Sequence, residues 1–255
     1  MIKEIITNTI KDRVSNAKTK TKYRQALVGY ADATDSDFKK LKKIVAPEYK
    51  LPEDILSNAK SVIAFFIPFS KKIVKDNQHK NKCTKEWAIA YKETNELINQ
   101  ICNALQERLS EEEIKVGWEE STHNFDEKRL ISLWSHRSAA KICGLGDFGL
   151  NKMLITEQGS AGRYGSLVID KYVSPSDKFT ETPCLYYQNG TCGVCIGECP
   201  TGALTKEGLD RHLCYSLLLK NDRNFKNELG EADSLFDVCG KCQVGPCAFE
   251  IPKQN

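Results

Sequence analysis

The sequence predicts a mixed α/β domain over residues 1–174, followed by a small cysteine-rich domain over residues 175–255. Two observations support this division. Helix and strand patterns alternate through the first part, whereas eight of the eleven cysteines fall between Cys184 and Cys247. A chain of 255 residues with 40% hydrophobic residues is long and apolar enough to bury a core.

Within the α/β domain, helices are expected over residues 1–17 and 35–45, and a strand over residues 61–68. The strand segment, SVIAFFIP, is a continuous apolar run that ends at Pro68, which is typical of a strand at the centre of a sheet. Residues 85–109 carry apolar side chains at spacings of three, four and seven, the pattern of an amphipathic helix.

The later part of this domain predicts one more helix over residues 128–142, ended by Gly144, and short strands over residues 152–156 and 165–170. The stretch 70–85 contains six lysines and is expected to form an exposed loop. Solvated lysines are the simpler interpretation. The alternative, a docking patch for an acidic electron donor or an RNA backbone, lacks interleaved aromatic side chains.

The bulk charge and the N-terminal sequence exclude several classes of protein. A formal net charge of +3 gives no argument for a nucleic-acid or membrane partner. The N-terminal residues interleave charged and apolar side chains, unlike a signal peptide, and no apolar run approaches the ~20 residues of a membrane-spanning helix. We therefore expect a cytoplasmic protein whose thiols stay reduced.

The cysteines after position 183 follow an iron–sulfur pattern. From Cys192 the motif is CxxCxxxCP, which resembles ferredoxin runs in which the cysteine before proline binds the other cluster. This crossover predicts a ferredoxin-like domain with two 4Fe–4S clusters. The first would be held by Cys184, Cys192, Cys195 and Cys247, and the second by Cys199, Cys214, Cys239 and Cys242.

Two other uses of these cysteines remain open. Two zinc ions, each bound by four thiolates, fit the CxxC pairs, although zinc sites seldom need the CxxxCP continuation. A disulfide framework conflicts with a long cytoplasmic chain and an odd cysteine count. The remaining three cysteines, Cys83, Cys102 and Cys143, are interpreted as buried or incidental thiols.

The cysteine pattern, the segment GLGDFGLNKMLIT followed by GRYGSLVID, and LPEDILSNAKSVIAFFIPF upstream resemble the epoxyqueuosine reductase and reductive dehalogenase families. The resemblance covers most of the chain. It implies a nitroreductase-like α/β domain that binds cobalamin, a corrinoid, and a ferredoxin-like domain that supplies it with single electrons. The chain ends at Asn255, without the C-terminal helical repeats of epoxyqueuosine reductases, so the resemblance describes a short form and argues against a tRNA partner.

The same resemblance assigns roles to individual residues. It makes the first cysteine set the ligands of the cluster nearer the corrinoid, and the second set those of the outer cluster. Gly144, Gly146 and Gly149 would lie against the macrocycle, because a flat ring needs close backbone approach, and Gly165 and Ser166 would do the same. Ordinary turns and a helix cap are the alternative explanation for these glycines.

The proton donor departs from the family pattern. Leu130 occupies the place where the family has an aspartate, fourteen residues before the GLG motif. Asp126 and His136 are the substitutes that we consider, since histidine can donate a proton near neutral pH. Tyr91 and Tyr164 are further candidates, for which core packing is the alternative.

Two functions follow from these observations. The first is a reductase of the epoxyqueuosine reductase type, in which two clusters pass electrons to a corrinoid that reduces a small-molecule substrate, with ferredoxin or flavodoxin as the electron donor. The second is a two-cluster electron carrier without cobalamin, which docks a redox partner.

Overall fold

The computed structural model describes residues 1–78, 82–121 and 125–253. Its centre is a four-stranded sheet in the order β1-β2-β8-β3, in which every neighbouring pair is antiparallel. The strands are β1 (Leu27–Asp32), β2 (Ser61–Pro68), β8 (Gly162–Ile169) and β3 (Val116–Gly117). The chain therefore has a mixed α/β fold, as predicted.

The β2 strand confirms the prediction of a central buried strand, because all eight of its residues are buried. Alternate side chains point to opposite faces of a sheet. Ile63, Phe65 and Ile67 accordingly pack into one hydrophobic cluster, and Val62, Ala64 and Phe66 pack into another. The continuous apolar sequence reflects this burial on both faces.

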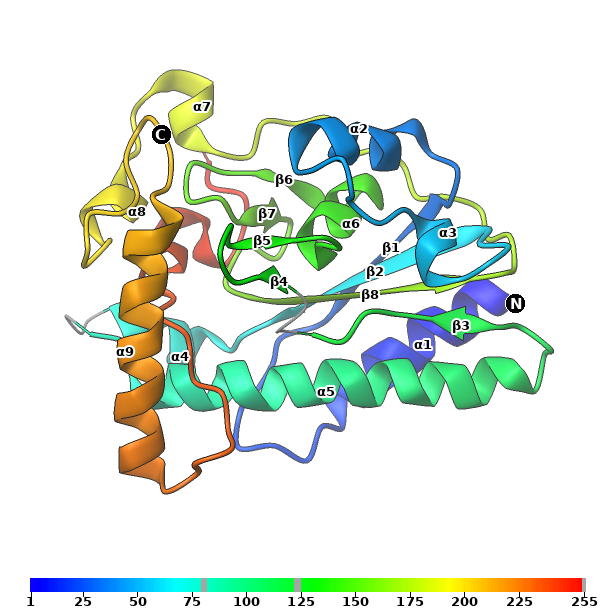
Figure 1. Ribbon diagram of the computed structural model, residues 1–255, viewed down its shortest axis with the longest axis horizontal. Coiled ribbons are helices and arrows are strands. Elements are labelled where there is room, and N and C mark those ends of the chain that lie inside the picture. The colour runs from blue at the N-terminus through cyan, green and yellow to red at the C-terminus, as the bar shows by residue number, and fades with distance from the viewer. Residues whose placement is uncertain (79–81, 122–124, 254–255) are drawn as a thin grey trace.

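Helices cover both faces of the sheet (Figure 1). The long helix α5 (Lys85–Ser110) and α1 (Ile2–Ser15) pack on one face. The other face is covered by α2 (Ser36–Ile44), α3 (Pro52–Ile55) and α6 (His136–Ile142).

The predicted exposed loop over residues 70–85 is wrong in its first half, where the structure has helix α4 (Lys71–Gln78). Its lysines point outward, but Ile73, Val74 and Asn77 are buried on one helical face. Spacings of one and four place such residues together on a helix, and this short stripe outweighs the lysine content. Lys80 lies outside the described residues.

The predicted helix over residues 128–142 begins later than expected. Its first part forms a small hairpin of β4 (Phe125–Asp126) and β5 (Ile131–Ser132), and α6 starts only at His136. The Ser135 hydroxyl accepts a hydrogen bond from the Ser138 amide and so caps the helix. Gly144, with φ of +82°, ends it as predicted. A second hairpin joins β6 (Gly146–Phe148) to β7 (Leu154–Thr156).

The cysteine-rich segment leaves the sheet and then returns to it. It contains the helices α7 (Leu185–Asn189), α8 (Val194–Gly197) and α9 (Arg211–Leu229), and the 3₁₀ turns η1 (Lys241–Gln243) and η2 (Pro246–Ala248). After α9, the side chains of Phe236, Val238 and Val244 join a hydrophobic cluster with Phe69 and Trp87. The last cysteines are therefore held against the α/β core.

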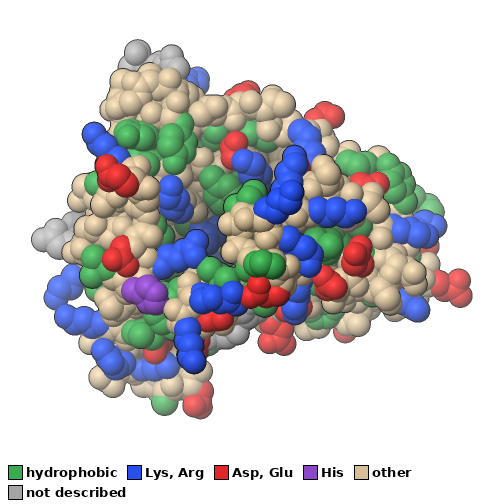
Figure 2. Space-filling model, turned by 45° about the horizontal axis from the view of Figure 1, so that its top comes forward, with side chains coloured by type: hydrophobic (Ala, Val, Ile, Leu, Met, Phe, Trp, Pro, Cys, Tyr) green, Lys and Arg blue, Asp and Glu red, His purple; other side chains and the backbone are tan. Residues whose placement is uncertain are grey.

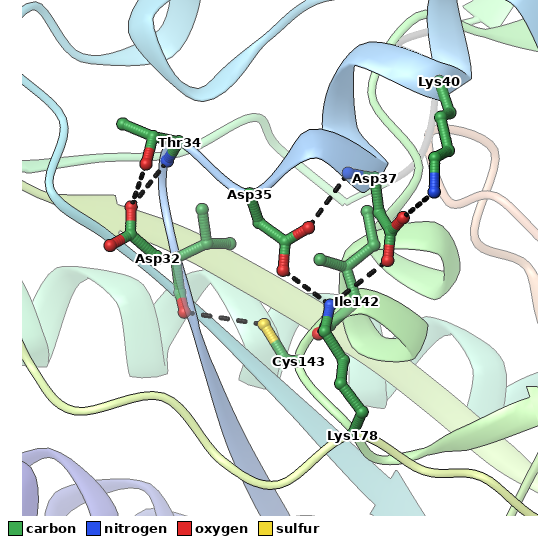
Figure 3. A network of polar contacts seen from close by, with 9 residues as sticks. Asp32, Thr34, Asp35, Asp37, Lys40, Ile142, Cys143 and Lys178 are labelled. Atoms are coloured by element: carbon green, nitrogen blue, oxygen red, sulfur yellow. Dashed lines mark hydrogen bonds and ion pairs between the residues drawn. The ribbon is translucent and has the colours of Figure 1, made fainter.

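The connection from β8 to the first of these cysteines is anchored by Lys178 (Figure 3). Its ammonium group lies 2.6 Å from the Asp35 carboxylate and 3.2 Å from that of Asp37, and it donates to the carbonyl of Ile142. Asp35 also caps α2 by accepting a hydrogen bond from the Asp37 amide. This network ties the linker to α2 and α6, and so sets where the cysteine-rich segment begins.

Among the described residues, no helix is both long and apolar enough to cross a membrane.

We expect Gly165→Ala to destabilise the protein by about 1–3 kcal/mol, because overpacking of a tight core costs that much. A methyl group at Gly165 would lie 2.3 Å from the Phe65 ring, which faces it across the β2–β8 pair. The measurement is the midpoint of chemical denaturation under anaerobic conditions. Gly208→Ala, where no atom lies within 4 Å of the added methyl, is the matched control. Equal midpoints for the two variants would refute this packing role.

Candidate functional site

Four of the eight late cysteines, from three separate stretches of the chain, line one small cavity. They are Cys184, Cys192, Cys195 and Cys247, the set predicted for the first cluster. Cys184 precedes α7, Cys192 and Cys195 lie around the start of α8, and Cys247 lies in η2. The apolar walls of this cavity come mainly from Leu150, Ile155 and Val194.

Backbone and hydroxyl groups contact the sulfurs of this first site. The Leu150 amide lies 3.5 Å from the Cys184 sulfur. The Ser160 hydroxyl lies 3.8 Å from the Cys247 sulfur, and the Ser160 amide donates to the Cys247 carbonyl at 2.9 Å. Such hydrogen bonds hold thiolate ligands in place and stabilise their negative charge.

The other four cysteines line a second, larger cavity of ≈ 480 Å³. They are Cys199, Cys214, Cys239 and Cys242, the set predicted for the second cluster. Cys214 projects from α9, Cys239 and Cys242 flank and enter η1, and Cys199 follows α8. Each predicted set of four cysteines therefore lines a single cavity. This volume is within the range of small-molecule sites, which is roughly 300–1,000 Å³.

Burial makes most of these thiols poor acids in the absence of a metal. Together with a smaller effect from neighbouring cysteines of the same set, burial raises the pKa of Cys195, Cys247 and Cys214 to about 11. The pKa of Cys242 is raised for the same two reasons. For Cys199, burial opposes ionisation, but hydrogen bonds from Thr201 and nearby amides outweigh it and lower the pKa. Four mutually repelling thiolates require a positive centre between them.

The spacing of the thiols bears on which centre this is. Among the described residues, no three His, Cys, Asp or Glu side chains converge tightly enough to hold a single metal ion. A zinc ion needs four sulfurs at about 2.3 Å from one point. A 4Fe–4S cluster spreads its ligands, because each thiolate binds a different iron. Zinc and a cluster thus differ in how closely the four sulfurs must converge.

Asn151 lies between the two cysteine sites and lines both cavities. It is 4% exposed, and its side-chain amide donates to the Cys242 carbonyl at 3.0 Å. The same nitrogen lies 3.8 Å from the Cys247 sulfur. Cys195 and Cys242, one from each set, are also close enough to influence each other's charge. The two sites are adjacent.

None of the five residues expected to lie against the corrinoid lines the large cavity, although Gly144 lines a separate one. A side chain at Gly144 would collide with the Asp177 carbonyl, at Gly146 with that of Ile155, and at Gly149 with the Ile155 side chain. In each case the close neighbour of the glycine belongs to the protein itself, so ordinary turns and close packing account for these glycines without a cofactor. Gly165 faces Phe65 in the core, and Ser166 lies beneath His136.

His136 does line the large cavity, as its candidate role requires. Its Nδ1 lies 2.7 Å from the Ser166 hydroxyl, which also accepts a hydrogen bond from the Trp134 indole. Burial, together with a smaller effect from the positive charge of Arg163, lowers the pKa of His136 to about 4. His136 is therefore neutral at pH 7 and can hydrogen bond there, but it is not a cationic proton donor.

Asp126, the other candidate proton donor, is held in an ion pair away from the large cavity. Its carboxylate is paired with the Arg129 guanidinium at 2.8 Å, and hydrogen bonds from Arg129 lower its pKa. Asp126 is therefore ionised at neutral pH and lies outside the cavity lining. Leu130, which replaces the aspartate of the resembling family, does line the cavity. Tyr164 also lines it, but its hydroxyl donates to the Leu154 carbonyl.

Sequence reasoning missed the residues that give the large cavity its charge. Arg137, Lys152, Arg163, Arg211 and Lys241 all line it, against one acidic residue, Asp237. Lysine and arginine side chains also gather around the hollow near the centre of the face in Figure 2. The second cysteine set, and not the first, adjoins the large cavity. The spacing of residues along the sequence predicts neither the basic lining of the cavity nor which cysteine set adjoins it.

The fold and the site define a class: a layered α/β protein with two adjacent four-cysteine sites, one of which opens into a ligand-sized cavity. No protein-family model matches the chain. In sequence, it is 25% identical over 201 residues to an epoxyqueuosine reductase from Bacillus anthracis, covering 74% of this chain and 48% of that protein. An epoxyqueuosine reductase from Bacillus cereus matches with the same identity and coverage.

Solved structures give the same result. The epoxyqueuosine reductase from Streptococcus thermophilus superposes with a TM-score of 0.60 at 17% identity, covering 100% of this chain and 69% of that one. An epoxyqueuosine reductase solved with a modified tRNA stem loop gives 0.59 at 19% identity over 97% and 66%. A catabolic reductive dehalogenase gives 0.58 at 14% identity over 89% and 30%.

The chain is thus a distant homologue of the epoxyqueuosine reductases, and it shares its fold with them and with reductive dehalogenase. It spans about half the length of the curated relatives that it matches.

The pKa of His136 can be tested directly. Its imidazole proton signal, assigned by comparison with His136→Gln, should titrate with a midpoint near pH 4 rather than near 6.5, the value in unfolded peptides. Because the unfolded chain binds the proton more readily, His136 should make stability rise with pH between about 4 and 6.5, and this part of the slope should vanish in His136→Gln. A midpoint above pH 6 would show that the imidazole is solvated.

Proposed function

We propose that this protein is an iron–sulfur reductase that holds two 4Fe–4S clusters. Cys184, Cys192, Cys195 and Cys247 would bind one, and Cys199, Cys214, Cys239 and Cys242 the other. One observation carries the proposal: eight cysteines form two adjacent groups of four, and the second group lines a cavity of ≈ 480 Å³. The distant relationship to a family of reductases supports it.

The donor chemistry suits such clusters. Thiolate sulfur is a soft ligand, which selects iron–sulfur clusters, zinc and copper over magnesium or calcium. The Leu150 amide and the Ser160 hydroxyl would stabilise the charge of the first group through contacts with its sulfurs. When bound, the clusters supply single electrons, which would come from a donor such as ferredoxin or flavodoxin.

The chain's own residues would bind and orient the substrate in the large cavity. Neutral His136, fixed by Ser166, offers a hydrogen bond without adding charge. Trp134, Tyr164 and Leu130 supply apolar surface that keeps water away from the reacting group. The same residues would position a small molecule next to the second cysteine group.

Cobalamin is the further cofactor that we propose for this cavity, on the strength of the family resemblance. Arg137 and Arg211 are both cavity-lining and exposed, so the cavity reaches the solvent and a cofactor larger than its volume can extend outward. A corrinoid, when bound, supplies a cobalt centre that accepts the electrons and reduces the substrate. A substrate carried by tRNA is the alternative to a small molecule, suggested by the relative solved with a tRNA stem loop.

A two-cluster electron carrier is the second candidate function. Leu130 replaces the acidic residue of the family, His136 is neutral, and Asp126 lies outside the cavity. A cavity without an obvious proton donor favours electron transfer to a docked partner. Titration with cobalamin separates the two functions: a shifted corrinoid spectrum with a saturating 1:1 stoichiometry supports the reductase, and an unchanged spectrum supports the carrier.

Iron content tests the clusters. We expect about eight irons per chain after anaerobic reconstitution with iron and sulfide, since each cluster contributes four. Cys195→Ala should hold about four irons fewer, because it removes a ligand from the first group, and Cys214→Ala about four fewer, because it removes one from the second. The measurement is elemental analysis by mass spectrometry.

The matched control for these variants is Cys102→Ala. Cys102 is buried in the main core beside α1 and lies in neither cysteine group, so this variant should keep about eight irons. Zinc in place of iron, or a full complement of iron in all three variants, would overturn the assignment of ligands.

A further inference from the structure

The large cavity contains more positive charge than its own carboxylates can neutralise. Among the described residues, no carboxylate lies within ion-pair distance of four of its lining residues: Arg137, Lys152, Arg163 and Arg211. Elsewhere in the molecule, basic residues such as Arg129 and Lys178 are paired with acids. Lys241 is excluded from this set, because its ammonium donates to the Asn77 carbonyl.

The guanidinium groups lie close enough to repel one another. Desolvation by the cavity wall lowers the pKa of Arg137, and the like charges of Arg163 and Arg211 lower it as well, although the side chain remains partly exposed to solvent. Arg163 also lowers the pKa of His136. Like charges gathered at one cavity cost free energy unless an anion lies between them. This repulsion is relieved when a negatively charged group binds.

Protein contacts hold two of these side chains in place. The Arg163 guanidinium lies over the Tyr91 ring, 4.3 Å from its centroid, and its Nε donates to the Asn95 side chain at 3.0 Å. Arg137 donates from Nη1 to the Lys152 carbonyl at 3.0 Å. Fixed guanidinium groups lose little conformational entropy on binding and match the geometry of carboxylate and phosphate oxygens.

Part of the remaining cavity wall is apolar. Phe125 and Tyr215 meet edge to face, with ring centroids 5.8 Å apart, and so join the β4–β5 hairpin to α9. Leu130, Leu209 and Leu218 extend this wall. A ligand that fills the cavity would therefore present an apolar body on one side and negative charge on the other.

We propose that the cavity binds a small anionic substrate, with its carboxylate or phosphate group between Arg137 and Arg163 and its apolar body against Phe125, Leu130 and Tyr215. This inference rests on the proposed function, since it names the substrate class of the same site.

A different account of the arginines is that they balance the negative charge of the second cysteine group. Cys242 does raise the pKa of Arg137, so the two charges are close. The two accounts make opposite predictions for ligand binding. Charge balance predicts no preference for anionic ligands, whereas a substrate site predicts a strong one.

The test is equilibrium dialysis of the full, iron-loaded chain against three probes of the same shape: benzoate, phenyl phosphate and the neutral benzamide. Charged hydrogen bonds contribute about 1.5–3 kcal/mol, and every 1.4 kcal/mol is tenfold in affinity. We expect at least one anionic probe to bind about tenfold or more tightly than benzamide. Preference for benzoate identifies a carboxylate substrate, and preference for phenyl phosphate identifies a phosphate.

Variants locate the binding group. Arg137→Gln and Arg163→Gln should each weaken the preferred anion about tenfold and leave benzamide unchanged. Arg129→Gln is the matched control, because its guanidinium pairs with Asp126 and Glu48 outside the cavity, and it should change neither affinity. Equal binding of the three probes, or no binding of any, overturns the proposal. So does an anion preference that survives both cavity variants.

Iron measured on the same samples separates the two levels of inference. If the chain holds about eight irons but shows no anion preference, the proposed function stands and the proposed substrate class is wrong. If the chain holds no iron, the proposed function is wrong, whichever probe binds.

Discussion

Four thiolates cannot share a small volume unless a positive centre lies between them, and this constraint bears on the whole cysteine-rich segment of the chain. Burial and mutual repulsion raise the pKa of Cys195, Cys214 and Cys247 to about 11. Thiols with such values have no use as free nucleophiles, because they stay protonated at neutral pH. In the proposed function, a bound metal centre would turn this cost into folding free energy, because it would stabilise the thiolates only when the ligands are assembled.

The ligands assemble because the chain returns to the sheet after α9. Gly240, with φ of +72°, lies against Trp87 so closely that a methyl group there would be 2.0 Å from the indole. Beside it, the buried Lys241 donates to the Asn77 carbonyl, and the Asn77 side chain donates to that of Cys239. These contacts fix η1 against α4 and α5, and Ser160 fixes η2 through the Cys247 backbone. The stability of the cysteine sites thus depends on the α/β core.

The same return creates the large cavity, because α9 and η1 close it on one side while α6 and the β4–β5 hairpin close the other. Its chemistry is mixed: thiols, guanidinium groups, a neutral histidine and an aromatic wall lie within one volume. His136 remains neutral partly because Arg163 is near, so the cavity's positive charge sets the protonation state of its histidine. The positive charge of the cavity therefore affects both ligand binding and the protonation state of His136.

The central strand, the long helix and the two groups of cysteines were predictable from local patterns. Apolar runs, helical spacing and the CxxCxxxCP motif each reflect physics that acts over a few residues, as in β2, α5 and the α8 region. The positions of Gly144, Gly146 and Gly165 were not predictable, since a glycine signals close approach without saying to what. Helix α4 was not predicted, because its lysines suggested an exposed loop. The basic lining of the cavity was not predictable either, because Arg137 and Arg163 lie on different elements and come together only when α6 and β8 pack. The sequence by itself therefore determined which residues can bind metal, and only the tertiary structure decided what surrounds them, because side-chain neighbours far apart in the chain are set by packing.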